Sequence, residues 1–307
     1  MKHLKEEIDE IARKIDALGV WKKLSSWNWA VKPRNSVFTY FCTILPGDGK
    51  PLKARLLMLE GPRTMQDFLA VRQNRDFGCI SSPMELPHFE LVVSEDKRII
   101  VRYDVAYLPR EAEPSRLSIV RDVLWESFGL MMRFEADETL PLRYADEGAL
   151  FARVEEGDGC WHDKPITLNT VCSVTEKISF DVKMLKKAED LPIIKDEVWA
   201  VDFRMNEQMV TKEPKPRFVY QLVVRDEKTK ALIADYRSSV NPEDGLKALW
   251  EAMPSQFLKV IVENGRVPGE LRLVSGRVFR FLRPLGIKLP FKLTLHDSLD
   301  SLSPNLI

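Results

Sequence analysis

Cys160 and His162 are close together in the sequence and could contribute ligands to a metal site. In the segment Cys160-Trp161-His162-Asp163 a thiol, an indole, an imidazole and a carboxylate follow one another, and zinc accepts sulfur, nitrogen and oxygen ligands. Cys172 lies ten residues after His162 and could join them. A structural zinc site needs four ligands, commonly with paired spacing, and the sequence offers no evident fourth. We therefore expect a polar loop here, with a metal site as the alternative.

A cysteine and a histidine could also form a nucleophile and its general base. The candidates are Cys160 and Cys172 as nucleophile, with His162, His88 or His296 as base. Their spacing brings no pair together. The sequence also has no Gly-x-x-x-x-Gly-Lys-Ser/Thr phosphate loop, no Gly-x-Gly-x-x-Gly and no Gly-x-Ser-x-Gly, which are signatures of common nucleotide-binding proteins and hydrolases. These motifs therefore predict no cofactor.

Basic side chains gather late in the chain. Arg272, Arg280 and Arg283 fall within residues 268–285, where the spacing of apolar residues predicts a helix. The three arginines are expected on its polar face, opposite the apolar side chains. Such a face could bind nucleic-acid phosphates, although no stripe of aromatic residues accompanies it to stack on bases. The interpretation that we prefer is a solvated helix face.

The composition is typical of an intracellular globular protein. The chain has 307 residues, with 46 Lys and Arg against 46 Asp and Glu, so its net charge gives no overall attraction to nucleic acid or to anionic membranes. No apolar run approaches the roughly 18 residues that span a bilayer, and the charged start lacks the apolar core of a secretory signal. Four cysteines without a Cys-x-x-Cys pair are typical of reduced thiols. We expect a cytoplasmic protein.

The elements that would position these residues form an α/β protein with two regions. Residues 1–185 are expected to form an N-terminal α/β region with a leading amphipathic helix over the first 20 residues, because Ile8, Ile11 and Ile15 share one helical face. Strands are expected at 36–45, 52–59, 89–93, 98–107, 149–154, 165–168 and 174–182, and helices at 64–73 and 114–134. The charged residues 186–196 are expected to form a linker.

Residues 186–307 are expected to form the second domain. Its predicted order is β-β-β-α-β-α-β, with strands at 198–203, 218–224, 231–238, 257–262 and 287–293 and helices at 241–253 and 268–285.

This order resembles that of a ribonuclease H-like domain. Val198-Trp199-Ala200-Val201-Asp202-Phe203 resembles the first strand of retroviral-type integrase and transposase cores, where a tryptophan precedes a strand-borne aspartate. The segment from Phe218 to Asp226 resembles their second strand and turn, and Val262-Glu263-Asn264-Gly265 resembles their Asp-Asn-Gly turn after the fourth strand. The resemblance extends over residues 197–293.

The resemblance implies a site in which carboxylates hold two divalent ions for phosphoryl transfer. Asp202 matches the first carboxylate position, and Glu263 falls where the family has aspartate. The third carboxylate should follow the last strand, where this chain offers only Asp297 and Asp300 and has no glutamate after Glu270. The catalytic set is therefore incomplete, and the domain is interpreted as degenerate.

The whole chain also resembles a group of uncharacterised bacterial proteins, through Leu45-Pro46-Gly47-Asp48-Gly49 and Leu285-Gly286-Ile287, and that resemblance implies no activity. Our first hypothesis is a non-catalytic interaction or structural protein that binds a protein partner or associates with itself. One alternative is a nuclease that uses Mg²⁺ or Mn²⁺ with Asp202, Glu263 and Asp300. The other is a non-catalytic nucleic-acid binder that uses the late arginines.

Overall fold

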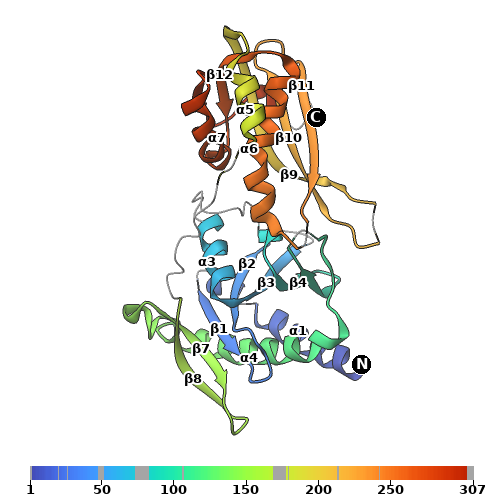
Figure 1. The fold of residues 1–307 in the computed structure, drawn as a ribbon. Coiled ribbons are helices and arrows are strands. Elements are labelled where there is room, and N and C mark those ends of the chain that lie inside the picture. The colour runs from blue at the N-terminus through green and yellow to red at the C-terminus, as the bar shows by residue number, and fades with distance from the viewer. Residues whose placement is uncertain are drawn as a thin grey trace. The chain divides into compact units, whose positions relative to one another are not determined.

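The chain folds into two units, each built on one mixed β-sheet with helices packed against it (Figure 1). The computed structural model describes residues 2–19, 21–25, 27–47, 52–72, 83–105, 107–168, 178, 180–212, 214–241 and 243–302. Among these, unit 1 contains the residues up to 168 except 105, 107 and 108, and unit 2 contains residues 178–302 together with those three. The expected α/β class is confirmed.

Two helices provide most of the helical packing in unit 1. The first, α1 (Lys2–Leu18), buries Ile8, Ile11 and Ile15, as its amphipathic pattern predicts, and is followed by Gly19 with φ of 65°, a backbone conformation that glycine adopts without strain. It packs against α4 (Leu117–Ala136), which follows the 3₁₀ turn Pro114–Arg116. Both helices were predicted with nearly these bounds.

The sheet of unit 1 has the strand order β6-β5-β4-β3-β2-β1-β7-β8. Its strands are β1 (Asn28–Lys32), β2 (Tyr40–Pro46), β3 (Leu52–Glu60), β4 (His88–Ser94), β5 (Arg98–Tyr103), β6 (Arg110–Glu111), β7 (Ala149–Glu155) and β8 (Trp161–Thr167). Among these described strands, β1 and β7 are the one parallel pair. The buried indole N–H of Trp29 on β1 donates to Ser127 Oγ on α4 at 3.0 Å, which fixes the helix to the sheet. Helix α3 (Gly61–Arg72) contacts β2 and β3.

The sheet of unit 2 has the strand order β11-β10-β9-β12-β13. Its strands are β9 (Ile193–Val210), β10 (Phe218–Asp226), β11 (Leu232–Ser239), β12 (Val267–Leu273) and β13 (Lys292–Leu295). Strand β10 is antiparallel to both of its neighbours, whereas β9, β12 and β13 run parallel. The helices are α5 (Val182–Glu189), α6 (Gly245–Asn264) and α7 (Gly276–Lys288), and a 3₁₀ turn, η5 (Asp300–Leu302), follows β13.

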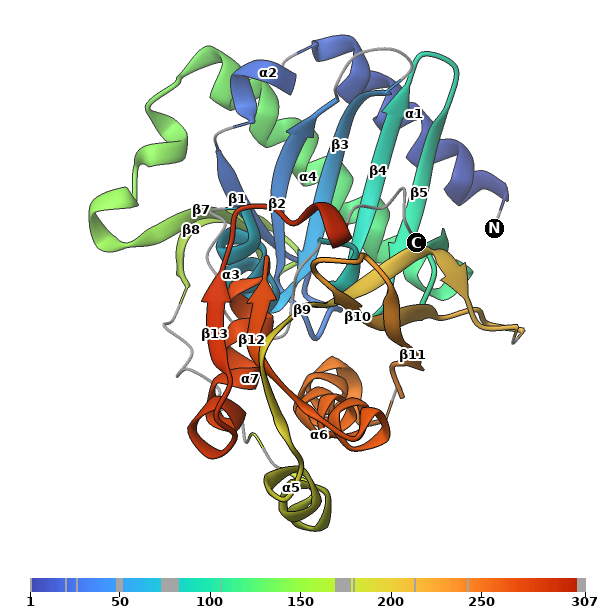
Figure 2. The same cartoon turned by 90° about the horizontal axis from the view of Figure 1, so that it is seen from above.

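Helices α6 and α7 cover one face of this sheet (Figure 2). Trp199 and Phe203 of β9 contact Phe257 and Trp250 of α6, and Trp250 in turn contacts Phe281 of α7. Because successive side chains of a strand point to opposite faces, the residues between Trp199 and Phe203 alternate in direction. We call the opposite side, to which Ala200, Asp202 and Arg204 point, the polar face.

Two predicted elements of unit 2 were wrong because short apolar runs fit strands and helices equally well. Residues 257–262 are not a strand but the second half of α6. The apolar side chains of α6 recur every three or four residues through Pro254 and bury Phe257 and Ile261. Residues 268–285 are not one helix. They contain β12 and most of α7, separated at Ser275, whose hydroxyl accepts the backbone N–H of Val278 at 3.3 Å and caps α7.

The predicted linker at 186–196 and the last strand also differ from the structure. Residues 186–189 complete α5 and 193–196 begin β9, so the expected boundary at residue 185 falls inside a helix. The last strand lies at 292–295 instead of 287–293, since α7 continues to Lys288. The strand expected at 174–182 falls mostly outside the described residues, and Val182 begins α5. In the described part of the chain, no helix combines the length and the apolarity needed to cross a membrane.

Candidate functional site

Asp202 lies on the central strand of unit 2 and points to the polar face. Its backbone is paired with that of Val223 on β10, and only 6% of the residue is exposed. The nearest basic group is the Arg204 guanidinium, with Nε 3.6 Å from Asp202 Oδ2. Burial raises the pKa of Asp202, and Arg204 and the backbone N–H of Phe203 only partly oppose that rise.

The turn η5 lies against the polar face close to Asp202. Leu302 packs with Ala200 and Val223, and the partly buried Val274 and Leu299 complete this apolar cluster. Asp300, in the same turn, is exposed. Ser301 is buried, and its hydroxyl donates to Glu227, which ties the turn to the sheet.

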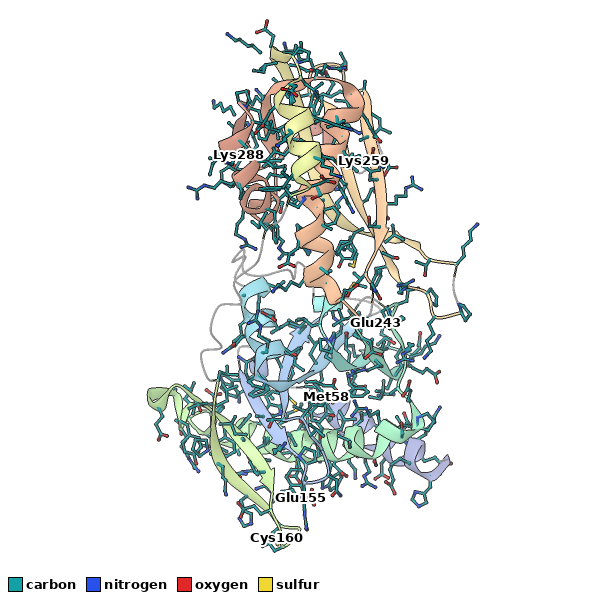
Figure 3. The ribbon with its side chains drawn as sticks, in the orientation of Figure 1. Met58, Glu155, Cys160, Glu243, Lys259 and Lys288 are labelled. Carbon is teal, nitrogen blue, oxygen red and sulfur yellow. The ribbon has the colours of Figure 1, made fainter. Side chains whose placement is uncertain are left out.

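Glu263 belongs to the helix-covered side of the sheet. It lies in the last turn of α6, before β12 and not after the fourth strand as expected, and Gly265 ends the helix with φ of 65°. Its carboxylate accepts the Tyr236 hydroxyl and lies 3.6 Å from Lys259 Nζ (Lys259 is labelled in Figure 3). Burial and the nearby Glu263 carboxylate raise the pKa of Tyr236 to about 12. The Asp202 and Glu263 side chains therefore lie on opposite faces of the sheet.

The three candidate arginines do not share one helix. Arg272 is on β12, where it pairs with Ala200 in register and so points to the polar face, with Nε 3.2 Å from Glu270 Oε1. Arg280 and Arg283 are on α7, Arg280 beside Phe281 at 5.6 Å and Arg283 exposed. The expectation of a single arginine face on one helix was wrong, because a strand and a cap interrupt residues 268–285.

The polar face carries a row of side-chain hydrogen bonds that sequence reasoning missed. Asn206 Nδ2 donates to Gln221 Oε1 at 2.9 Å, Gln221 Nε2 donates to Asp235 Oδ1 at 2.7 Å, and Arg237 donates to Asp235 Oδ2 at 2.7 Å. Burial would raise the pKa of Asp235, but the bonds from Arg237 and Gln221 outweigh it and lower that pKa. The polar residues at every second position of β9 from Asp202 onward were the signal that could have revealed this face.

Residues 184–304 match a domain of unknown function (DUF6930). The matched segment runs from α5 to η5 and so contains the five-stranded sheet with Asp202, Glu263, Asp300 and the three arginines. No curated protein and no solved structure matches the chain.

Outside the DUF6930 segment, the candidate metal ligands Cys160, His162 and Asp163 lie in the hairpin of β7 and β8. Cys160 is exposed in the turn between β7 and β8 (Figure 3), where its N–H donates to Asp158 at 2.9 Å. Both carboxylate oxygens of Asp163 accept bonds from Arg133, at 3.0 and 2.6 Å, and Arg153 adds a bond at 2.9 Å. In the described parts of both units, no group of three or more His, Cys, Asp or Glu residues is arranged to hold a metal ion. Cys172 lies outside the described residues.

The histidines considered as general bases are on separate elements. His88 begins β4 and is buried, with Nδ1 2.8 Å from the carbonyl oxygen of Leu86. His296 follows β13 in unit 2, with Nε2 3.2 Å from the Thr294 hydroxyl. His162 is on β8 with Nε2 3.7 Å from Glu156 Oε2. The cysteine-histidine hypothesis gains no support from these placements.

Proposed function

We propose that this chain is a non-catalytic interaction protein and that the elements of unit 2 from β9 to η5 form a degenerate ribonuclease H-like domain. The strand order supports this fold. The central strand β9 has antiparallel β10 and then β11 on one side and parallel β12 and β13 on the other. The crossovers into β12 and β13 pass through α6 and α7.

The observation that carries the proposal is the placement of Asp202 and Glu263 on opposite faces of the sheet. Two-metal phosphoryl transfer requires carboxylates that converge on one pair of ions. Asp202 points to the polar face, whereas Glu263 is bonded to Tyr236 at the end of α6. On the polar face the neighbours of Asp202 are Val223, its partner on β10, and the Arg204 guanidinium, and among the described residues no group of three His, Cys, Asp or Glu gathers around it. Carboxylates separated in this way do not meet the requirement for two-metal hydrolysis.

The charge pattern of the polar face favours a protein partner over nucleic acid. Acidic and basic side chains alternate, as in the pairs Asp235–Arg237 and Glu270–Arg272. A nucleic-acid backbone presents only negative charge and would be repelled by the carboxylates, whereas a protein surface can present the complementary pattern.

Calorimetric titration with Mg²⁺ and with Mn²⁺ tests the proposal that the protein is non-catalytic. We expect no saturable heat from the native chain and the same result from the double variant Asp202→Asn, Glu263→Gln. The double variant Glu189→Gln, Glu243→Gln removes two exposed carboxylates of unit 2 that are not candidate ligands and controls for the change in net charge. Saturable binding that only the first double variant abolishes would overturn the proposal.

Fluorescence anisotropy with single-stranded RNA and with duplex DNA tests the nucleic-acid alternative. Binding through phosphate contacts is saturable, and its affinity falls steeply as the salt concentration rises. We expect no such binding. Binding of that kind, weakened by the double variant Arg280→Gln, Arg283→Gln, would contradict a protein partner.

A further inference from the structure

Unit 1 contains a pocket of about 380 Å³ lined by α1, α4 and β8. Its walls combine two indoles with several carboxylates. Trp125 from α4 and Trp161 from β8 are the aromatic residues, and Trp125 is 49% exposed. The carboxylates are Glu7, Glu10, Asp122 and Glu126. Arg121 pairs with Glu7 and Asp122, Arg153 pairs with Glu126, and Lys14 pairs with Glu10. Indole faces and carboxylates are both groups that attract an organic cation.

A cation of the chain already occupies part of this pocket. The Lys14 ammonium lies 5.1 Å from the centre of the Trp125 ring and 2.8 Å from Glu10 Oε1. Both contacts of Lys14 are weak. Its side chain is 41% exposed, and an ion pair that is exposed to water contributes little to stability. Lys14 can therefore leave the indole for solvent at small cost when another cation arrives.

We propose that this pocket binds an arginine side chain of a partner protein. A guanidinium group fits better than an ammonium, because its planar face stacks on an indole while its edge forms paired hydrogen bonds with carboxylates. In this arrangement the arginine takes the place of Lys14 over Trp125 and approaches Glu10. The inference deepens the proposed function, since it names the chemistry of the partner.

An exposed apolar stripe on α4 indicates that the arginine belongs to a peptide segment. Met132 is 44% exposed and follows Trp125 by seven residues on the same helix face, so the two side chains are about 10 Å apart along the axis. Phe128 lies between them and contacts Trp125 with a ring-centre distance of 6.0 Å. An extended peptide covers about 10 Å in three residues. For a peptide that runs parallel to α4, an arginine in the pocket would place the third residue after it beside Met132.

The test is a titration of the full chain followed through the indole N–H resonance of Trp125, identified by its loss in Trp125→Leu. N-acetyl-arginine N-methylamide should shift this resonance saturably, and the neutral isostere N-acetyl-citrulline N-methylamide should not. Lys14→Gln should strengthen arginine binding about two- to fivefold, the ratio that corresponds to one exposed cation–π contact.

Unit 2 offers a matched control for Lys14. Lys259 lies 5.1 Å from the Tyr236 ring centre and pairs with Glu263 four residues later, so Lys259→Gln removes an equivalent contact away from the pocket and should leave arginine binding unchanged. Equal shifts with arginine and citrulline, or an equal gain of affinity in both lysine variants, would overturn the proposal.

Two peptides test the source of the arginine. Acetyl-Arg-Ser-Ser-Leu-amide should bind more tightly than acetyl-Arg-Ser-Ser-Ser-amide, and Met132→Ser should remove the difference. Free L-arginine that binds as tightly as the leucine peptide would overturn the assignment to a protein segment. These readouts report on unit 1, whereas the metal titration reports on unit 2, so the two proposals fail separately.

Discussion

Replacing Arg204 with glutamine should destabilise unit 2, because it leaves the buried Asp202 carboxylate without its counter-charge. Two unit charges separated by 3.6 Å attract by roughly 5 kcal/mol at an effective dielectric constant of about 20. The Arg204 side chain is 35% exposed, however, so water screens much of this attraction. We expect the free energy of unfolding to fall by about 1–2 kcal/mol at pH 7.

The free energy of unfolding should also depend on pH through Asp202. Burial raises the pKa of Asp202 in the folded chain above its ordinary value of 3.8, so the folded state holds the proton more tightly than the unfolded state does. The wild type should therefore lose stability relative to Asp202→Asn as the pH rises above 3.8 and through the folded-state pKa. For the same reason, the cost of Arg204→Gln should shrink as the pH falls and Asp202 becomes protonated.

Hydrogen exchange of peptides from β9 and β10, measured between pH 3.5 and pH 7, reports the free energy of opening of this part of the sheet. Arg237→Gln is the matched control, because it breaks a pair with Asp235 on the same face but involves a side chain that is 54% exposed. We expect its effect on the free energy of opening to be negligible, because water screens an exposed ion pair. The reasoning is refuted if Arg204→Gln costs no more than this control, or costs the same at both ends of the pH range.

Three further predictions concern unit 2. Gly269→Ala should lower the free energy of unfolding by about 1–3 kcal/mol, because the added Cβ would lie 2.2 Å from the backbone oxygen of Lys195. Urea denaturation measures this change, and an unchanged midpoint would contradict the close approach of β9 and β12. Glu263→Gln should lower the pKa of Tyr236 from about 12 toward 10, which ultraviolet titration against the wild type would detect. Ser275→Ala should cost about 1 kcal/mol and speed hydrogen exchange at the start of α7, whereas Ser275→Asp should preserve the cap.

Local sequence patterns correctly predicted the elements whose pattern of apolar and polar residues lies within the element itself. The helix α1 follows from isoleucines on one face, which need only a sheet and a second helix to cover them. The hairpin of β10 and β11 was predicted from two segments rich in apolar residues that are joined by a polar turn. In that turn the Asp226 carboxylate accepts the backbone N–H groups of Lys228 and Thr229. In both cases the pattern within the segment is enough to predict the element.

The run from Phe257 to Val262 shows where local patterns fail. Its sequence is apolar except at Lys259, and periodicity alone cannot tell a short apolar run of this length in a strand from one in a buried helix. The preceding turn of α6 and the packing of Trp250 and Phe257 against Phe203 and Trp199 make the segment helical. Shifting one strand from 257–262 to 267–273 also moved Glu263 from the end of a strand to the end of a helix.

The sequence by itself determined the α/β class, the order of elements from β9 to β13 and the residue types available for chemistry, because composition and short-range periodicity encode them. Only the tertiary structure decided which of those residues meet. Asp202 and Glu263 are separated by a sheet whose two faces are assigned by strand pairing and helix packing. Trp125, Lys14 and Trp161 meet in one pocket although they come from three distant elements. Such contacts depend on interactions between residues far apart in the chain, and no pattern within one segment contains them.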